Sequence, residues 1–90
     1  MTNTIDDLEL YRLVGNRVRE IRTKFNLNQS QLGERLGLNR TSITNIEQGT
    51  QKLPLHVLYR FCLEFNLSLD DVLPDLLAVA MIYQMSQIKF

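Results

Sequence analysis

Helix start and stop signals follow one another closely between Asn28 and Gly49, and they limit the folds open to this chain. Asn28, with Gln31 three residues later, is a capping pattern that begins a helix, and Gly37 is a residue type that ends one. Asn39 begins the next helix at once, and Gly49 ends it. The chain is therefore expected to form two short helices joined by a tight turn.

A glycine inside the first of these short helices sharpens that expectation. Gly33 stands mid-helix, where glycine costs about 1 kcal/mol relative to alanine. A small residue at this point, followed by the stop at Gly37 and the cap at Asn39, lets the two helices meet at a steep angle. This is the helix-turn-helix arrangement, with a generic corner of two helices as the alternative.

Apolar residues recur at spacings of three and four along most of the chain, which predicts amphipathic helices. The two short helices bury Leu32, Leu36, Ile43 and Ile46. Three further helices are expected: one capped by Asp6 and Glu9 with the stripe Tyr11, Val14, Val18, Ile21 and Phe25; one opened by Pro54 with the stripe Leu55, Leu58, Cys62 and Phe65; and one capped by Ser68 and Asp71 that carries Leu69, Val72 and Leu73. The expected fold is all-α, with five compact helices over residues 1–74 and an apolar tail over residues 75–90.

The third helix, about residues 40–48, has two different faces. Ile43 and Ile46 lie on one face, and the opposite face carries Arg40, Thr41, Thr44, Asn45 and Gln48. A face that is only solvated favours Glu and Lys, because Thr and Asn are poor helix formers. Arg pairs bidentately with guanine, Asn pairs with adenine, and a Thr methyl contacts a thymine methyl. The pattern favours contact with DNA bases, and a polar surface without a function is the alternative.

Two opposite charges lie at the margins of buried helix faces. Glu47 lies beside the apolar stripe of the third helix, and Arg22 lies beside that of the first. We expect a partly buried ion pair that fixes the orientation of the third helix more than it adds net stability.

The distribution of charge bears on the partner. The formal net charge is zero, which by itself argues against nucleic acid. However, residues 12–52 hold eight basic and three acidic residues, a balance of +5, whereas residues 1–11 and 53–90 are acidic. The total of zero therefore does not exclude DNA. It indicates modest non-specific affinity for DNA, so that base-specific contacts and dimerisation are expected to supply the rest of the binding affinity.

Catalysis and metal binding find little support in the sequence. One cysteine and one histidine cannot supply the four ligands of a structural zinc, and Cys62 and His56 point to different sides of one helix. Asp70 and Asp71 lie in the first turn of a helix, where they complement its dipole. The four glycines fit no phosphate-binding loop. We expect no enzymatic activity, no cofactor and no metal.

Export and membrane signals are also missing from the sequence. The acidic start lacks the basic region of a signal peptide, and the apolar run over residues 76–83 is shorter than the ~20 residues of a spanning helix. The lone cysteine suits a reducing compartment. We expect a cytoplasmic protein without a membrane partner.

The tail is too apolar to lie alone in water, and this indicates an interface. The candidate interface residues are Leu76, Leu77, Val79, Met81, Ile82, Tyr83, Met85, Ile88 and Phe90. A helix is the first interpretation, because Ala, Leu and Met favour it, and an exchanged strand over residues 79–83 is the second. The expected partner is a second copy of the chain, with a tail folded over its own core as the alternative.

The segments LNQSQLGERLGL (residues 27–38) and SITNIEQG (residues 42–49) resemble the Cro and phage-repressor type of helix-turn-helix DNA-binding protein. The resemblance extends from about Val14 to Leu73. It implies a lambda-repressor-like fold and a sequence-specific transcriptional regulator from a bacterium or phage. The resemblance and the polar face of the third helix together lead us to expect that this helix inserts into the major groove. With a dimer formed through the tail, the expected target is a palindromic operator, and the protein would be nucleoid-associated when bound. By family habit alone, we expect a repressor.

The resemblance also implies roles for matching positions. The base-contacting residues would be Arg40, Thr41, Thr44 and Asn45. The phosphate-contacting residues would be Asn28, Gln29, Asn39, Gln48, Thr50 and Lys52. Arg22 and Glu47 match a family salt bridge, in agreement with their positions on the helices. Gly33 departs from the usual alanine, and we expect it to loosen the second helix without moving its contacts.

The alternative function is that of a protein-interaction module. The same fold serves as the antitoxin of a toxin–antitoxin pair, with the toxin held by the tail, or as an anti-repressor. An antitoxin would also bind DNA, so a second protein that co-purifies with the chain distinguishes the two functions.

Overall fold

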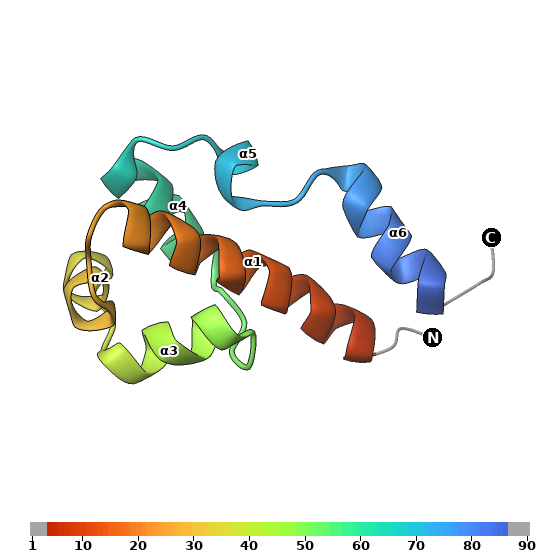
Figure 1. Ribbon diagram of the computed structural model, residues 1–90, viewed down its shortest axis with the longest axis horizontal. Coiled ribbons are helices and arrows are strands. Elements are labelled where there is room, and N and C mark those ends of the chain that lie inside the picture. Colours follow the sequence, from red (N-terminus) through yellow and green to blue (C-terminus); the bar gives the residue numbers. More distant parts are fainter. Residues whose placement is uncertain (1–3, 87–90) are drawn as a thin grey trace.

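The computed structural model describes residues 4–86, with side chains over residues 7–84. In this range the chain forms helices and no strand (Figure 1). The helices are α1 (Thr4–Lys24), α2 (Gln29–Leu36), α3 (Arg40–Gln48), α4 (Leu55–Phe65), α5 (Leu69–Val72) and α6 (Leu76–Ser86). The all-α fold with five helices before the tail is confirmed, and the tail forms a helix rather than a strand.

The core surrounds the C-terminal half of α1. Helices α2 to α5 gather around this half, whereas α6 lies beside the N-terminal half (Figure 1). The buried apolar side chains are Val14, Val18, Ile21, Leu32, Leu36, Ile43, Ile46, Val57, Leu58, Phe61, Cys62, Phe65 and Val72. The molecule measures 43 × 24 × 21 Å, because α6 and the start of α1 project beyond the five-helix body.

The caps of α2 and α3 form as the sequence predicts. The Asn28 Oδ1 accepts from the Gln31 N–H at 2.8 Å, and the Gln31 Oε1 accepts from the Asn28 N–H at 2.8 Å. The Asn39 Oδ1 caps α3. Gly37 and Gly49 end the two helices with φ of 72° and 79°, the left-handed region that glycine adopts without strain.

The close packing of α1 on α3 depends on Gly15, which the sequence analysis does not single out. A Cβ at Gly15 would lie 2.0 Å from the Ile46 carbonyl oxygen and 2.9 Å from that of Glu47. A Cβ at Gly33 would similarly lie 2.4 Å from the Leu38 carbonyl oxygen. Gly33 therefore has the packing role expected of a small residue at this point, because it lets α2 approach the turn before α3 closely.

Three sequence predictions differ from the structure. The cap predicted at Asp6 is wrong, because α1 begins at Thr4. Phe25 lies in the turn after α1 and is 47% exposed, with its ring against that of Phe65 at a centroid distance of 4.8 Å. Leu55 is 67% exposed, because the buried face of α4 is centred nearly 90° away from it around the helix, so that Val57 enters the core instead.

Replacement of Gly15 by alanine tests the α1–α3 packing. Alanine favours the helix by about 1 kcal/mol, but its methyl group would overlap two carbonyl oxygens of α3. We expect Gly15→Ala to lower the free energy of unfolding by about 1–3 kcal/mol, measured by urea denaturation. Asn16→Ala is the control, because Asn16 is the exposed neighbour on the same helix. A Gly15→Ala protein more stable than the parent would contradict the close packing.

Candidate nucleic-acid interface

A buried ion pair joins α1 to α3. The Arg22 Nε donates to the Glu47 Oε2 at 2.6 Å, and the Arg22 Nη2 donates to the Glu47 Oε1 at 3.0 Å. Only 11% of the Arg22 side chain and 3% of the Glu47 side chain are exposed. The expected pair is therefore present, and it is bidentate.

Further hydrogen bonds extend this pair into a network over three helices. The Arg22 Nη1 donates to the Leu27 carbonyl at 2.8 Å, which ties down the segment before α2. The Gln29 Nε2 donates to the Glu47 Oε1 at 3.1 Å, and the Gln29 Oε1 accepts from the Thr44 hydroxyl at 2.7 Å. Because the buried charges are hydrogen-bonded as well as paired, the network fixes α2 and α3 against α1.

The four residues predicted to contact bases lie on α3, away from its buried face. Arg40 and Thr41 are exposed, whereas Thr44 and Asn45 are half-buried. The single O–H of Thr44 is shared between the Gln29 Oε1 at 2.7 Å and the Arg40 carbonyl at 3.1 Å, so that its one donor is already engaged within the protein. Thr44 therefore offers a ligand its methyl group and the lone pairs of its oxygen, but not its O–H proton.

The residues predicted to contact phosphate surround this face. Asn28, Asn39, Gln48, Thr50 and Lys52 are exposed. Asn28 and Asn39 use their side-chain oxygens as helix caps, which leaves their amide NH₂ groups available to a ligand.

Gln29, the sixth of these residues, is half-buried, and its amide already bridges Glu47 and Thr44. Its second amide hydrogen is the donor that remains for a phosphate.

Sequence reasoning missed Arg19 as a residue of this surface. The exposed Arg19 side chain of α1 lines an open depression of about 280 Å³ together with Arg22, Gln29, Glu47 and Gln48. Its position three residues before Arg22 on α1 was a signal in the sequence, but the neighbouring groups come from α2 and α3.

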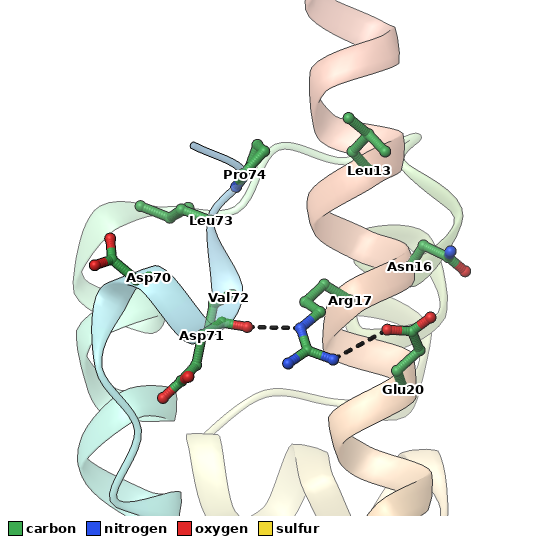
Figure 2. Close-up of a pocket in the computed structure, with 9 residues that line it drawn as sticks. All are labelled: Leu13, Asn16, Arg17, Glu20, Asp70, Asp71, Val72, Leu73 and Pro74. Carbon is green, nitrogen blue, oxygen red and sulfur yellow. Dashed lines mark hydrogen bonds and ion pairs between the residues drawn. The ribbon is translucent and has the colours of Figure 1, made fainter. Parts of the chain in front are cut away.

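A second hollow, about 380 Å³, lies between α1 and α5 (Figure 2). Here the Arg17 Nε donates to the Asp71 carbonyl at 2.6 Å, and the Arg17 Nη1 pairs with Glu20 at 3.1 Å. Asp70 also lines the hollow. The concentration of carboxylates makes this hollow unsuited to phosphate, and Arg17 fastens α5 to α1.

The single cysteine has no features of a nucleophile. Burial, and to a smaller extent the negative charge of Asp71, raise the pKa of the Cys62 thiol, so that it is protonated at neutral pH. Within residues 7–84, no three His, Cys, Asp or Glu side chains gather as a metal site would require.

Helix α6 packs along the N-terminal half of α1, where the Tyr83 hydroxyl donates to the Asp7 Oδ1 at 2.8 Å. Val79, Ile82 and Tyr83 are half-buried. Leu76, Leu77 and Met81 are 82%, 72% and 57% exposed, so one apolar face of α6 remains open. The side chain of Met85 and the whole of Ile88 and Phe90 lie outside the described residues. In the described part of the chain, no helix has the length and apolarity needed to cross a membrane.

Comparison with known proteins places these features in a family. Residues 15–78 match the family of helix-turn-helix domains. The chain is 34% identical over 56 residues to an uncharacterized HTH-type transcriptional regulator of Archaeoglobus fulgidus. The matched region covers 62% of this chain and 79% of that protein. It is 33% identical over 57 residues to the uncharacterized HTH-type transcriptional regulator YgzD of Bacillus subtilis. This match covers 63% of this chain and 86% of the relative.

Removal of one partner of the ion pair tests its structural role. We expect Glu47→Ala to lower the free energy of unfolding by about 3–5 kcal/mol, because Arg22 is then buried without a counter-charge. The control is Glu34→Ala, which removes an exposed carboxylate of α2. Urea denaturation gives both values, and equal stability of Glu47→Ala and the parent would contradict the role assigned to the pair.

Proposed function

The chain belongs to the family of helix-turn-helix domains, and we propose that it is a sequence-specific DNA-binding transcriptional regulator. The observation that carries the proposal is the polar face of α3, which is exposed at Arg40 and Thr41 and half-buried at Thr44 and Asn45. The buried Arg22–Glu47 pair holds this face in a fixed orientation. The relatives named as HTH-type transcriptional regulators support the same function.

The proposed mechanism is insertion of α3 into the major groove. Arg40, Thr41, Thr44 and Asn45 contact base edges, with Arg40 able to pair bidentately with guanine and Asn45 with adenine. Thr44 contributes its methyl group rather than its O–H proton, since that one donor is shared between Gln29 and the Arg40 carbonyl. Each bidentate pair is worth about 1–3 kcal/mol of discrimination against a wrong base.

Contacts to the DNA backbone hold α3 in register. The proposed donors are the amides of Asn28, Gln29 and Asn39 at the starts of α2 and α3, together with Gln48, Thr50 and Lys52 at and after the end of α3. Lys52 is the charged member of this set, so it contributes most to the salt dependence of binding.

The tail supports the proposal of a homodimer. Helix α6 is apolar around most of its circumference, and a helix of this kind is stable only when it is covered on more than one side. Because α1 covers one side, a second copy is the occupant proposed for the open side with Leu76, Leu77 and Met81. Residues 1–74 then bind DNA and residues 75–90 join the two copies.

A dimer would present two α3 helices to a palindromic operator with half-sites about 34 Å apart. Occupancy of such an operator in the cytoplasm would block polymerase, which is the action of a repressor. The open face of α6 also favours a second candidate function, an antitoxin that binds DNA and holds a toxin on the same leucines.

Selection of bound sequences from a random DNA pool tests the proposed function. We expect the parent protein to enrich a palindrome, because two copies of α3 contact two half-sites. We expect Arg40→Ala to lose affinity for that palindrome by about 1–3 kcal/mol and to lose its preference at one base pair in each half-site. Equal weakening on the palindrome and on random DNA would make Arg40 a phosphate contact. Failure of the parent to enrich any sequence would refute sequence-specific binding.

Substitution of the open face of α6 tests the dimer. We expect the parent to be a dimer by light scattering at micromolar concentration, and the variant with Leu77→Ser and Met81→Ser to be a monomer. Leu63→Ser is the control, because Leu63 of α4 is 82% exposed and lies outside α6. A parent that is already monomeric would contradict the dimer, and a second protein that co-purifies on this face would favour the antitoxin.

A further inference from the structure

We propose that Arg19 of α1 binds a phosphate of the DNA backbone, in addition to the contacts attributed to α2, α3 and the segment after α3. This inference rests on the proposed function and concerns the same interface. It adds a contact from a third helix, which resemblance to the family did not suggest.

The position of Arg19 is the first observation. The depression of about 280 Å³ brings together Arg19 from α1, Gln29 from α2 and Gln48 from α3. Gln29 and Gln48 are two of the residues already expected to contact phosphate. A backbone phosphate bound to these two amides would therefore lie in the depression that the Arg19 side chain lines.

The shape of the neighbouring surface is the second observation. A larger open hollow of about 500 Å³ adjoins this depression, and Arg19, Glu47 and Gln48 line both. The remaining residues of the larger hollow are Glu9, Arg12, Leu13 and Asn16, all of α1. A concave surface thus continues from the C-terminal end of α3 along α1, as a path for a DNA strand beside the groove that α3 enters.

The charged side chains of this surface differ in whether they are already paired. The Glu47 carboxylate also lines the depression, but Arg22 and Gln29 occupy both of its oxygens. Arg12 pairs with Glu9 at 2.5 Å. The Arg19 guanidinium has no hydrogen-bond or ion-pair partner among the described residues. It is therefore the cation of this surface whose charge is available to a ligand, and an arginine fork suits phosphate oxygens.

Arg17 provides an internal comparison on the same helix. It lies two residues before Arg19, about 200° around α1, and lines the hollow shown in Figure 2. Its guanidinium binds the Asp71 carbonyl and Glu20, and that hollow holds further carboxylate charge. Two arginines of equal charge thus differ in what they face, and only Arg19 faces the proposed DNA.

The salt dependence of DNA binding tests the proposal. Each phosphate neutralised by a cation makes the slope of log K against log [salt] steeper by about 0.9. We expect Arg19→Gln to make the slope on a random-sequence duplex shallower by about one unit per protomer bound. The ratio of parent to variant affinity then falls about fourfold between 50 and 200 mM salt. Fluorescence anisotropy with a labelled duplex measures these slopes.

Two matched variants complete the experiment. Arg17→Gln makes the same change of charge on the opposite side of α1, and we expect it to keep the slope of the parent. Arg19→Lys keeps the positive charge, and we expect it to keep most of the slope. Circular dichroism and urea denaturation of each variant show that the protein measured is folded.

The possible results separate this inference from the proposed function. An Arg19→Gln slope equal to that of the parent refutes the Arg19 contact while DNA binding stands. Equal loss of slope in Arg17→Gln and Arg19→Gln also refutes it, because the effect is then one of net charge. A parent chain that binds neither selected nor random DNA refutes the proposed function, and the Arg19 contact with it.

Discussion

The orientation of α3 depends on the need to satisfy one buried carboxylate. The Glu47 side chain is almost fully enclosed, and its two oxygens accept from Arg22 of α1 and Gln29 of α2. These donors reach it together because α1, α2 and α3 meet at this point. A shift of α3 by even one residue along its axis, about 1.5 Å, would break the short bonds and leave charges unpaired in the core. The exposed face of α3 therefore takes its direction from an interaction on its buried side.

Most of the fold could be predicted because its signals are local. Asn28, Gly37, Asn39 and Gly49 act through hydrogen bonds and backbone angles within a few residues, which are the same in any surroundings. The Arg22–Glu47 pair could also be predicted, because helical periodicity placed each charge at the margin of a buried face. For this pair, the sequence pattern and the structure depend on the same helical periodicity.

The features that were missed depend on contacts between distant segments. Gly15 has an ordinary place in the sequence of a helix. Only the approach of the Ile46 carbonyl from α3 shows that a side chain would not fit there. Arg19 is one of several arginines of α1, and its neighbours Gln29 and Gln48 come from other helices. Leu55 fits the spacing of an apolar stripe, but the direction from which the core meets α4 leaves it exposed. No short-range rule contains this information.

The continuity of α1 has a mechanical consequence. This single helix of 21 residues packs against α3 near its middle and against α6 near its start. In a dimer joined through α6, it would be a rigid strut between the joint and each DNA-contacting helix. The distance between the two α3 helices would then be set by stiff parts rather than by a flexible linker, and each base pair inserted at the centre of an operator would rotate one half-site by about 34–36° out of register. Such a dimer would select its targets by half-site spacing as well as by sequence.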